Sequence, residues 1–275
     1  MLIIFQLLAS FVLTVLFGIK IGVDFSVIGV LSVLGIFIVN FIIVFIVIFI
    51  LYVIFIYTTE KASKTNKIKH YLINSLGEYI FVMMFRVKMI VTGKENLPKD
   101  NNFVIYMNHI EYTDPIYVKI VYHKYPVAYV AKEPLFKTVL IKNVLRSIGC
   151  VSITKDADRS AMKSIIESIN IVKSGQPMGI FPEGKRTYSN ALIEFKPGAF
   201  KLAMKANADI SPVCLYNMHG LLKKYRLRTH KIYIHILPII PYKEYQGMDS
   251  QSLAEQVKTL INDQLIEYKK RIPEN

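Results

Sequence analysis

A histidine and an aspartate stand five residues apart in a short polar segment of this chain. Residues 108–115 read N-H-I-E-Y-T-D-P and follow the apolar run 103–107. A neutral imidazole can take a proton from a hydroxyl group near pH 7, and it does so better when a carboxylate holds its other ring nitrogen. His109 is therefore a candidate general base, and Asp114 is the candidate group that orients it.

Other roles suit the same two residues. Aspartate followed by proline is typical of a helix start, so Asp114 could instead be an N-cap before Pro115. A single histidine after a strand is often structural. A metal site is disfavoured, because the spacing H-x4-D has no second nearby histidine or cysteine at the spacing of zinc ligands. We therefore expect no bound metal.

A second polar segment places two cations beside a glycine. Residues 181–187 read F-P-E-G-K-R-T, so an apolar run ends in proline and glycine before Lys185 and Arg186. Such a turn presents backbone N–H groups and a guanidinium, which together suit a phosphate. Arginine can grip a phosphate with two parallel hydrogen bonds, whereas lysine supplies a point charge.

Taken together, the two segments resemble the 1-acylglycerol-3-phosphate acyltransferase family, whose members make phosphatidic acid. The family pattern N-H-x4-D matches residues 108–114, and F-P-E-G-x-R matches residues 181–186. Further matches are A-K-E-P-L-F at 131–136, Gly149 with Lys155 for G-x5-R, F-K-P-G-A-F at 195–200 and I-S-P-V at 210–213. Two positions depart from the pattern: Lys155 replaces an arginine, and Lys185 stands where the family often has threonine.

The resemblance implies transfer of an acyl group from a thioester, on acyl carrier protein or coenzyme A, to the sn-2 hydroxyl of lysophosphatidic acid. His109 would be the base and Asp114 its partner. The hydroxyl would attack the thioester directly, and the lack of a G-x-S-x-G elbow agrees with that. The implied substrate-binding residues are Asn108, Lys132, Lys155, Glu183, Gly184, Lys185 and Arg186.

Within that set, the resemblance implies different tasks. Arg186, Lys155 and Lys132 would hold the acceptor phosphate. Glu183 would either bind the glycerol part of the acceptor or brace its loop, and backbone N–H groups near Gly184 are candidates for holding the developing oxyanion. No cofactor is implied beyond the acyl thioester, which is a co-substrate.

The first 57 residues are almost free of charge, which excludes a freely soluble protein. Only Lys20 and Asp24 are charged there. About 20 apolar residues span a bilayer, so residues 1–57 predict a transmembrane hairpin of two helices. The lysines that follow, at positions 61, 64, 67 and 69, favour a cytoplasmic location for the rest of the chain.

After a polar linker at 58–69, residues 70–275 form the expected acyltransferase domain. Short apolar runs alternate with helical spacing, which predicts an α/β fold. The family resemblance implies a mixed sheet flanked by helices, like that of glycerol-3-phosphate acyltransferase. A helix is expected over 72–83 and a helix or helical turn over 135–148, and Ser252 with Glu255 predicts a capping box at the start of the last helix.

The charge of the chain leaves other functions open. Lys and Arg outnumber Asp and Glu by 34 to 20, a net charge of +14. A basic surface suits anionic headgroups or an acidic carrier protein, and the candidate contact consists of Lys223, Lys224, Arg226, Arg228 and Lys231. One alternative is the same chemistry on glycerol 3-phosphate or another lysophospholipid. A second is a membrane-tethered basic lipid-binding module without catalysis; no nucleic-acid motif is present.

The two cysteines, Cys150 and Cys214, stand in apolar surroundings and form no CxxC motif. We expect both to be buried small side chains in a reducing compartment. A catalytic Cys150 is disfavoured, because no base is adjacent to it in the sequence.

Overall fold

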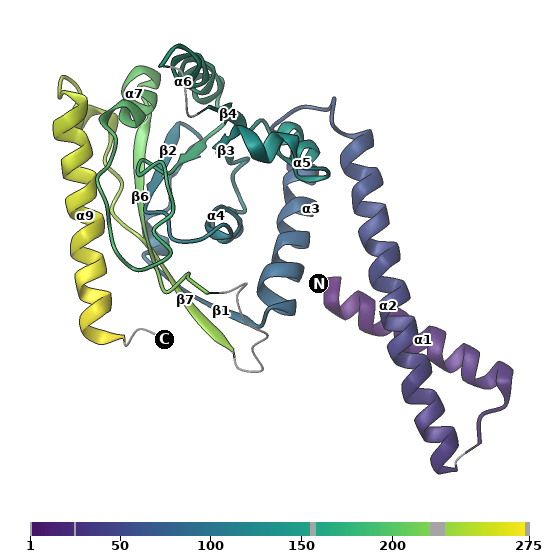
Figure 1. The fold of residues 1–275 in the computed structure, drawn as a ribbon. Helices are drawn as coiled ribbons and strands as arrows, with labels where there is room; N and C mark the ends of the chain where they lie inside the picture. Colours follow the sequence, from purple (N-terminus) through teal and green to yellow (C-terminus); the bar gives the residue numbers. More distant parts are fainter. Residues whose placement is uncertain (1, 25, 155–157, 221–228, 273–275) are drawn as a thin grey trace. The chain divides into compact units, whose positions relative to one another are not determined.

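The computed structural model describes residues 2–24, 26–154, 158–220 and 229–272. The chain divides into two compact units, Met1–Glu60 and Lys61–Asn275 (Figure 1).

The first unit is a hairpin of two apolar helices, α1 (Leu2–Ile21) and α2 (Val27–Thr58). Polar contacts join them: the side-chain amide of Gln6 donates to the carbonyl oxygen of Phe41 over 2.9 Å, and that of Asn40 donates to the Thr14 hydroxyl over 3.1 Å. Both helices are long and apolar enough to cross a membrane. The 32 residues of α2 reach about 48 Å, which exceeds a hydrocarbon core of about 30 Å.

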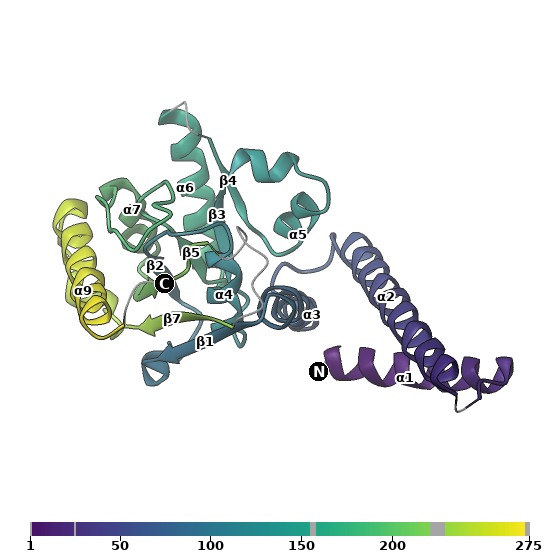
Figure 2. The same cartoon turned by 60° about the horizontal axis from the view of Figure 1, so that its bottom comes forward.

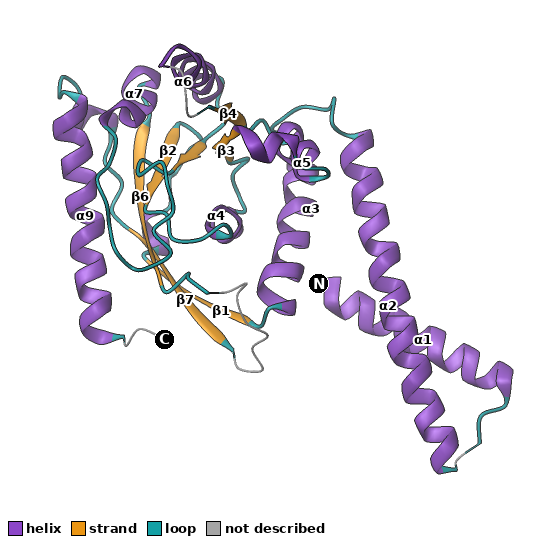
Figure 3. Cartoon of the chain, in the orientation of Figure 1, coloured by secondary structure: helices purple, strands orange, loops and turns teal. Residues whose placement is uncertain are grey.

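In the described part of the second unit, seven strands form one sheet in the order β1-β7-β6-β2-β5-β3-β4. Figure 3 shows strands of this sheet in orange. Neighbouring strands are parallel except for β6 and β7. The mixed sheet expected from the sequence is therefore confirmed. The strands are β1 (Val87–Thr92), β2 (Phe103–Met107), β3 (Ala128–Lys132), β4 (Val151–Ile153), β5 (Met178–Ile180), β6 (Asp209–Tyr216) and β7 (His230–Ile236).

Helices cover both faces of this sheet (Figures 1 and 2). One face carries α6 (Asp158–Lys173), α7 (Pro197–Ala206) and α9 (Ser250–Arg271), and the other carries α3 (Lys67–Gly77) and α4 (Asp114–Val121). The central strand β2 is covered on both sides, so every one of its residues is buried. Its unbroken apolar sequence follows from that position.

The linker region differs from the expectation. Helix α3 begins at Lys67, inside the stretch 58–69, because the Asn66 side chain accepts a hydrogen bond from the Lys69 backbone N–H and caps the helix. The ammonium group of Lys69 is buried and donates to the carbonyl oxygens of Ala62 and Ser147. The helical spacing over 72–83 covers two elements, since α3 passes into a π-helix at Glu78–Met84.

Two further helices start elsewhere than predicted. The stretch 135–148 is broken, because Leu140 has a left-handed φ of 67° between a 3-10 helix (Glu133–Lys137) and α5 (Ile141–Ser147). The capping box at Ser252 and Glu255 is wrong. Helix α9 begins two residues before Ser252, and the Asp249 carboxylate caps it by accepting from the backbone N–H groups of Gln251 and Ser252.

Candidate active site

The sheet topology brings the two polar segments to one edge. Strands β2 and β5 are parallel neighbours, with Tyr106 opposite Ile180. The segments that follow them, 108–114 and 181–188, therefore both leave the sheet at its carboxyl-terminal edge, where α/β proteins place ligands.

Two backbone hydrogen bonds then join the segments directly. The N–H of Thr187 donates to the carbonyl oxygen of His109 over 2.9 Å, and the N–H of Tyr188 donates to that of Ile110 over 3.1 Å. The Thr187 hydroxyl donates to the same His109 carbonyl over 3.2 Å. Hydrogen bonds therefore hold the segment 181–187, which carries Lys185 and Arg186 and is called the cationic turn below, against the histidine loop, residues 108–114.

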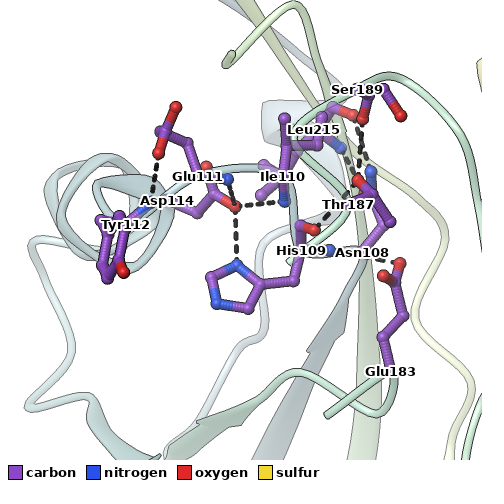
Figure 4. Close-up of polar contacts among 10 residues, drawn as sticks. All are labelled: Asn108, His109, Ile110, Glu111, Tyr112, Asp114, Glu183, Thr187, Ser189 and Leu215. Carbon is purple, nitrogen blue, oxygen red and sulfur yellow. Dashed lines mark hydrogen bonds and ion pairs between the residues drawn. The ribbon is translucent and has the colours of Figure 1, made fainter. Parts of the chain in front are cut away.

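His109 and Asp114 form a hydrogen-bonded pair (Figure 4). Nδ1 of His109 lies 2.8 Å from Oδ2 of Asp114, whose side chain is fully buried, while the imidazole keeps 17% of its surface exposed. An ionised carboxylate can only accept, so in the neutral imidazole Nδ1 carries the hydrogen and Nε2 keeps its lone pair. The pair is arranged as a base with its orienting partner.

The carboxylate of Asp114 is also the centre of its loop. The oxygen that faces His109 accepts the backbone N–H groups of Ile110 over 2.6 Å and Glu111 over 2.8 Å. Burial raises the pKa of Asp114, while these hydrogen bonds act against that rise. The N-cap of α4 is Thr113. The N-cap role considered for Asp114 is therefore wrong, because its side chain turns back toward the loop.

The imidazole ring is held from a second side by the cationic segment. Phe181 stacks on His109 with ring centroids 3.9 Å apart and an interplanar angle of 25°. This contact and the bond to Asp114 restrict ring rotation, so Nε2 has a defined direction.

Asn108, expected among the substrate-binding residues, is fully buried. Its amide nitrogen donates to the carbonyl oxygen of Leu215 over 2.9 Å, and its amide oxygen accepts the Leu215 N–H over 2.8 Å (Figure 4). Both ends of the amide are used to attach the end of β2 to β6. The geometry favours a positioning role for Asn108.

Glu183 lies under the loop with 3% of its surface exposed. One carboxyl oxygen accepts the His109 backbone N–H over 3.3 Å, and the other has no partner among the described residues. Burial raises the pKa of Glu183 to about 8, the His109 N–H acts against this, and nearby Asp114 adds to it. The bond to His109 favours the bracing role over contact with the acceptor.

Gly184 closes the cationic turn. It has a φ of 69° and its N–H donates to the carbonyl oxygen of Phe181 over 3.1 Å, so this N–H is already used and cannot hold an oxyanion. A Cβ added there would lie 3.1 Å from Nζ of Lys196. Lys196 therefore lies beside the turn that carries Lys185 and Arg186.

Two residues at this site were missed in the sequence. Lys196 belongs to the F-K-P-G-A-F segment, and Tyr112 belongs to the variable part of N-H-x4-D. The guanidinium carbon of Arg186 lies 3.3 Å from the centroid of the Tyr112 ring. No sequence pattern predicts that Lys196 lies beside Gly184 or that Tyr112 stacks on Arg186, because only the fold brings these residues together.

The structure describes only some of the remaining cations that the sequence predicts at a binding surface. Lys132 ends β3, which runs parallel to β5, so it reaches the same edge of the sheet. Lys155 lies outside the described residues, as do Lys223, Lys224, Arg226 and Arg228. Lys231 is an exposed residue of β7.

Both cysteines are buried, as expected. Burial raises the pKa of each thiol, that of Cys150 to about 11. Neither forms a thiolate readily near neutral pH, which disfavours a nucleophilic role.

Comparison with known proteins finds acyltransferases. A family model described as Acyltransferase matches residues 88–216. The chain is 32% identical over 182 residues to the 1-acyl-sn-glycerol-3-phosphate acyltransferase of Borreliella burgdorferi, covering 66% of this chain and 71% of that protein. It is 29% identical over 192 residues to the protein of the same name from Bacillus subtilis, covering 67% of this chain and 94% of that one.

A solved structure shares the fold. The crystal structure of the 1-acyl-sn-glycerophosphate acyltransferase from Thermotoga maritima matches with a TM-score of 0.65 at 23% sequence identity. The match covers 80% of this chain and 89% of that one.

Proposed function

This chain belongs to the acyltransferase family of these relatives, and we propose that it acylates the sn-2 hydroxyl of 1-acylglycerol-3-phosphate with an acyl thioester. The resemblance seen in the sequence is thereby confirmed at the level of the family. In the proposed reaction an ester C–O bond forms and the thioester C–S bond breaks, so the products are phosphatidic acid and a free thiol.

The hydrogen-bonded pair of His109 and Asp114 carries this proposal. Nε2 of His109 takes the proton from the acceptor hydroxyl as the oxygen attacks the thioester carbonyl. Asp114 stabilises the imidazolium that forms. The tetrahedral intermediate collapses with loss of the thiolate, which then receives the proton from His109. A positioned base of this kind contributes about 10²- to 10⁴-fold to the rate.

The cations of the second segment supply the acceptor site. Arg186 makes no ion pair with any described residue, so its guanidinium can bind the acceptor phosphate with two hydrogen bonds. Lys185 and Lys196 add positive charge to this end of the site. The phosphate would hold the glycerol backbone while His109 acts on its hydroxyl.

The apolar hairpin of α1 and α2 suits these substrates. Acceptor and product are both amphiphiles, so an enzyme anchored in the bilayer need not extract them into water. The lysines that follow α2 favour a cytoplasmic location for the catalytic domain. Coenzyme A and acyl carrier protein both remain candidate carriers of the acyl group.

Activity with defined substrates tests the proposal. The full chain, purified in detergent, would be given acyl-coenzyme A or acyl carrier protein as donor, and thiol release and lipid product would be followed. We expect release that needs lysophosphatidic acid and yields phosphatidic acid, and the more efficient donor identifies the carrier. Monoacylglycerol, which lacks the phosphate, is the matched control acceptor.

Two outcomes would contradict this proposal. Equal activity with monoacylglycerol would remove the role of the phosphate site. Release that requires glycerol 3-phosphate or another lysophospholipid, with none from lysophosphatidic acid, would reassign the acceptor.

A further inference from the structure

An aromatic side chain from the histidine loop covers the face of the arginine in the cationic turn. The guanidinium carbon of Arg186 lies 3.3 Å from the Tyr112 ring centroid and 5.5 Å from that of Tyr188. A cation over a ring face at this distance is attracted by the ring quadrupole, and arginine also stacks flat on it. The two rings themselves are 6.3 Å apart.

Tyr112 is fixed from the side of the histidine loop. Its backbone N–H donates to one carboxyl oxygen of Glu111 over 3.2 Å, and the other oxygen accepts the N–H of Gly220 over 3.3 Å. The Glu111 side chain is buried. Tyr112 also stands three residues after His109 and two before Asp114, so it belongs to the same rigid loop as the base.

Tyr188 is fixed from the side of the cationic turn. It adopts a left-handed φ of 53°, and its backbone N–H bonds to Ile110. A side-chain hydrogen bond joins it to Tyr112. The stacking of Arg186 on Tyr112 therefore links the segment 181–188 to the histidine loop, in addition to the backbone hydrogen bonds between them.

Stacking leaves the edge of the guanidinium free. Arg186 has no hydrogen bond or ion pair with the part of the chain that the structure describes, so its N–H groups are available to bind an anion. Tyr112 is 56% exposed and therefore has little role in packing. Its contact with Arg186 gives a physical reason for a large aromatic side chain at this position.

We infer that Tyr112 is a positioning residue, which sets the plane of the Arg186 guanidinium and so its separation from His109. This inference rests on the proposed binding of the acceptor phosphate by Arg186. Because Tyr112 and His109 share a loop, the phosphate anchor and the base keep a constant spacing. That spacing would present the hydroxyl to Nε2 once the phosphate is bound.

A double-mutant cycle tests the inference on the full chain in detergent. Tyr112→Leu and Tyr112→Phe would be made in the wild type and in Arg186→Met. The KM values for lysophosphatidic acid and for the acyl donor would be measured, with lysophosphatidic acid binding followed separately by calorimetry. Tyr71→Leu is the matched control, since Tyr71 is 52% exposed on α3 and outside the site.

We expect Tyr112→Leu to raise the KM and Kd for lysophosphatidic acid about fivefold to tenfold, with the donor KM unchanged. Tyr112→Phe keeps the ring face and should stay within about twofold of wild type. In Arg186→Met, the change Tyr112→Leu should have no further effect, because the cation that it positions is gone.

The opposite results would overturn the inference. These are equal effects of Tyr112→Leu with and without Arg186, a Phe variant as impaired as the Leu variant, or a Leu variant like wild type. Turnover that does not depend on Tyr112 would reject the inference alone. Binding that depends on Tyr112 and Arg186, without turnover, would reject the proposed reaction alone. No binding of lysophosphatidic acid would reject both.

Discussion

The Oδ2 atom of Asp114 accepts a hydrogen bond from Nδ1 of His109 over 2.8 Å and, at the same time, closes the loop between the two residues through the N–H groups of Ile110 and Glu111. One carboxylate therefore shapes the loop and orients the His109 ring. Changes at Asp114 should show these two functions separately.

Asp114→Asn should lower kcat about 10²- to 10⁴-fold, because a neutral amide does not stabilise the imidazolium that forms on His109. Its oxygen can still accept the two backbone N–H groups, so the Tm should fall little. Asp114→Ala should lose both functions and also unfold at a lower temperature, since buried N–H groups lose their acceptor. Near wild-type kcat in Asp114→Asn would contradict the assignment.

Glu183→Gln should change how stability depends on pH. Burial raises the pKa of Glu183 from 4.5 to about 8, so between these values the unfolded chain releases a proton that the folded chain retains. The free energy of unfolding of the wild type therefore falls as the pH rises through that window. Glutamine removes the effect and can still accept the His109 N–H.

Thermal unfolding of both proteins in detergent at several pH values checks this prediction. The Tm values should be similar near the lower limit of the window, and Glu183→Gln should be the more stable protein near pH 8. Parallel Tm curves across the window would mean that the carboxyl titrates normally.

Gly184→Ala should weaken acceptor binding. The φ of 69° costs an alanine about 1–2 kcal/mol, and its Cβ would lie 3.1 Å from Nζ and Cε of Lys196. The KM for lysophosphatidic acid should rise as the turn and Lys196 shift. Gly198→Ala is the matched control, because nothing lies within 4 Å of a Cβ there. Equal KM values for the two variants would argue against this account of the turn.

Asn108→Ala should destabilise the protein through β2 and β6. The change leaves the buried N–H and carbonyl groups of Leu215 without partners, at a cost of about 1–3 kcal/mol each. Asn102→Ala is the matched control, since Asn102 makes an exposed bond to Asn207. A fall in Tm no larger than that of the control would show that the Asn108 amide has another role.

The sequence predicts the parts of this fold that depend on local pattern. The apolar run 103–107 matches β2 residue for residue, because a central parallel strand is buried on both faces. The two motifs also predict the candidate site, since they follow neighbouring strands. What local pattern cannot supply is a partner distant in the chain: Asn108 bonds to Leu215, 107 residues away, and Tyr112 stacks on Arg186.

Some local patterns also fit two structures equally well. Asp114 before Pro115 matches a helix cap as well as a base partner, and the choice depends on three donors that meet only after the loop folds. At the last helix, Ser252 satisfies the capping-box pattern. The actual cap is Asp249, three residues earlier, whose carboxylate accepts two backbone N–H groups.

The most direct test of the central claim is thiol release by the wild type and by His109→Ala, each with and without lysophosphatidic acid. If Nε2 of His109 activates the acceptor for direct transfer, release by the wild type requires the acceptor. The variant should then lose about 10²- to 10⁴-fold in rate while keeping its Tm. A burst of thiol from the wild type without acceptor, or full activity in a folded His109→Ala variant, would contradict the claim.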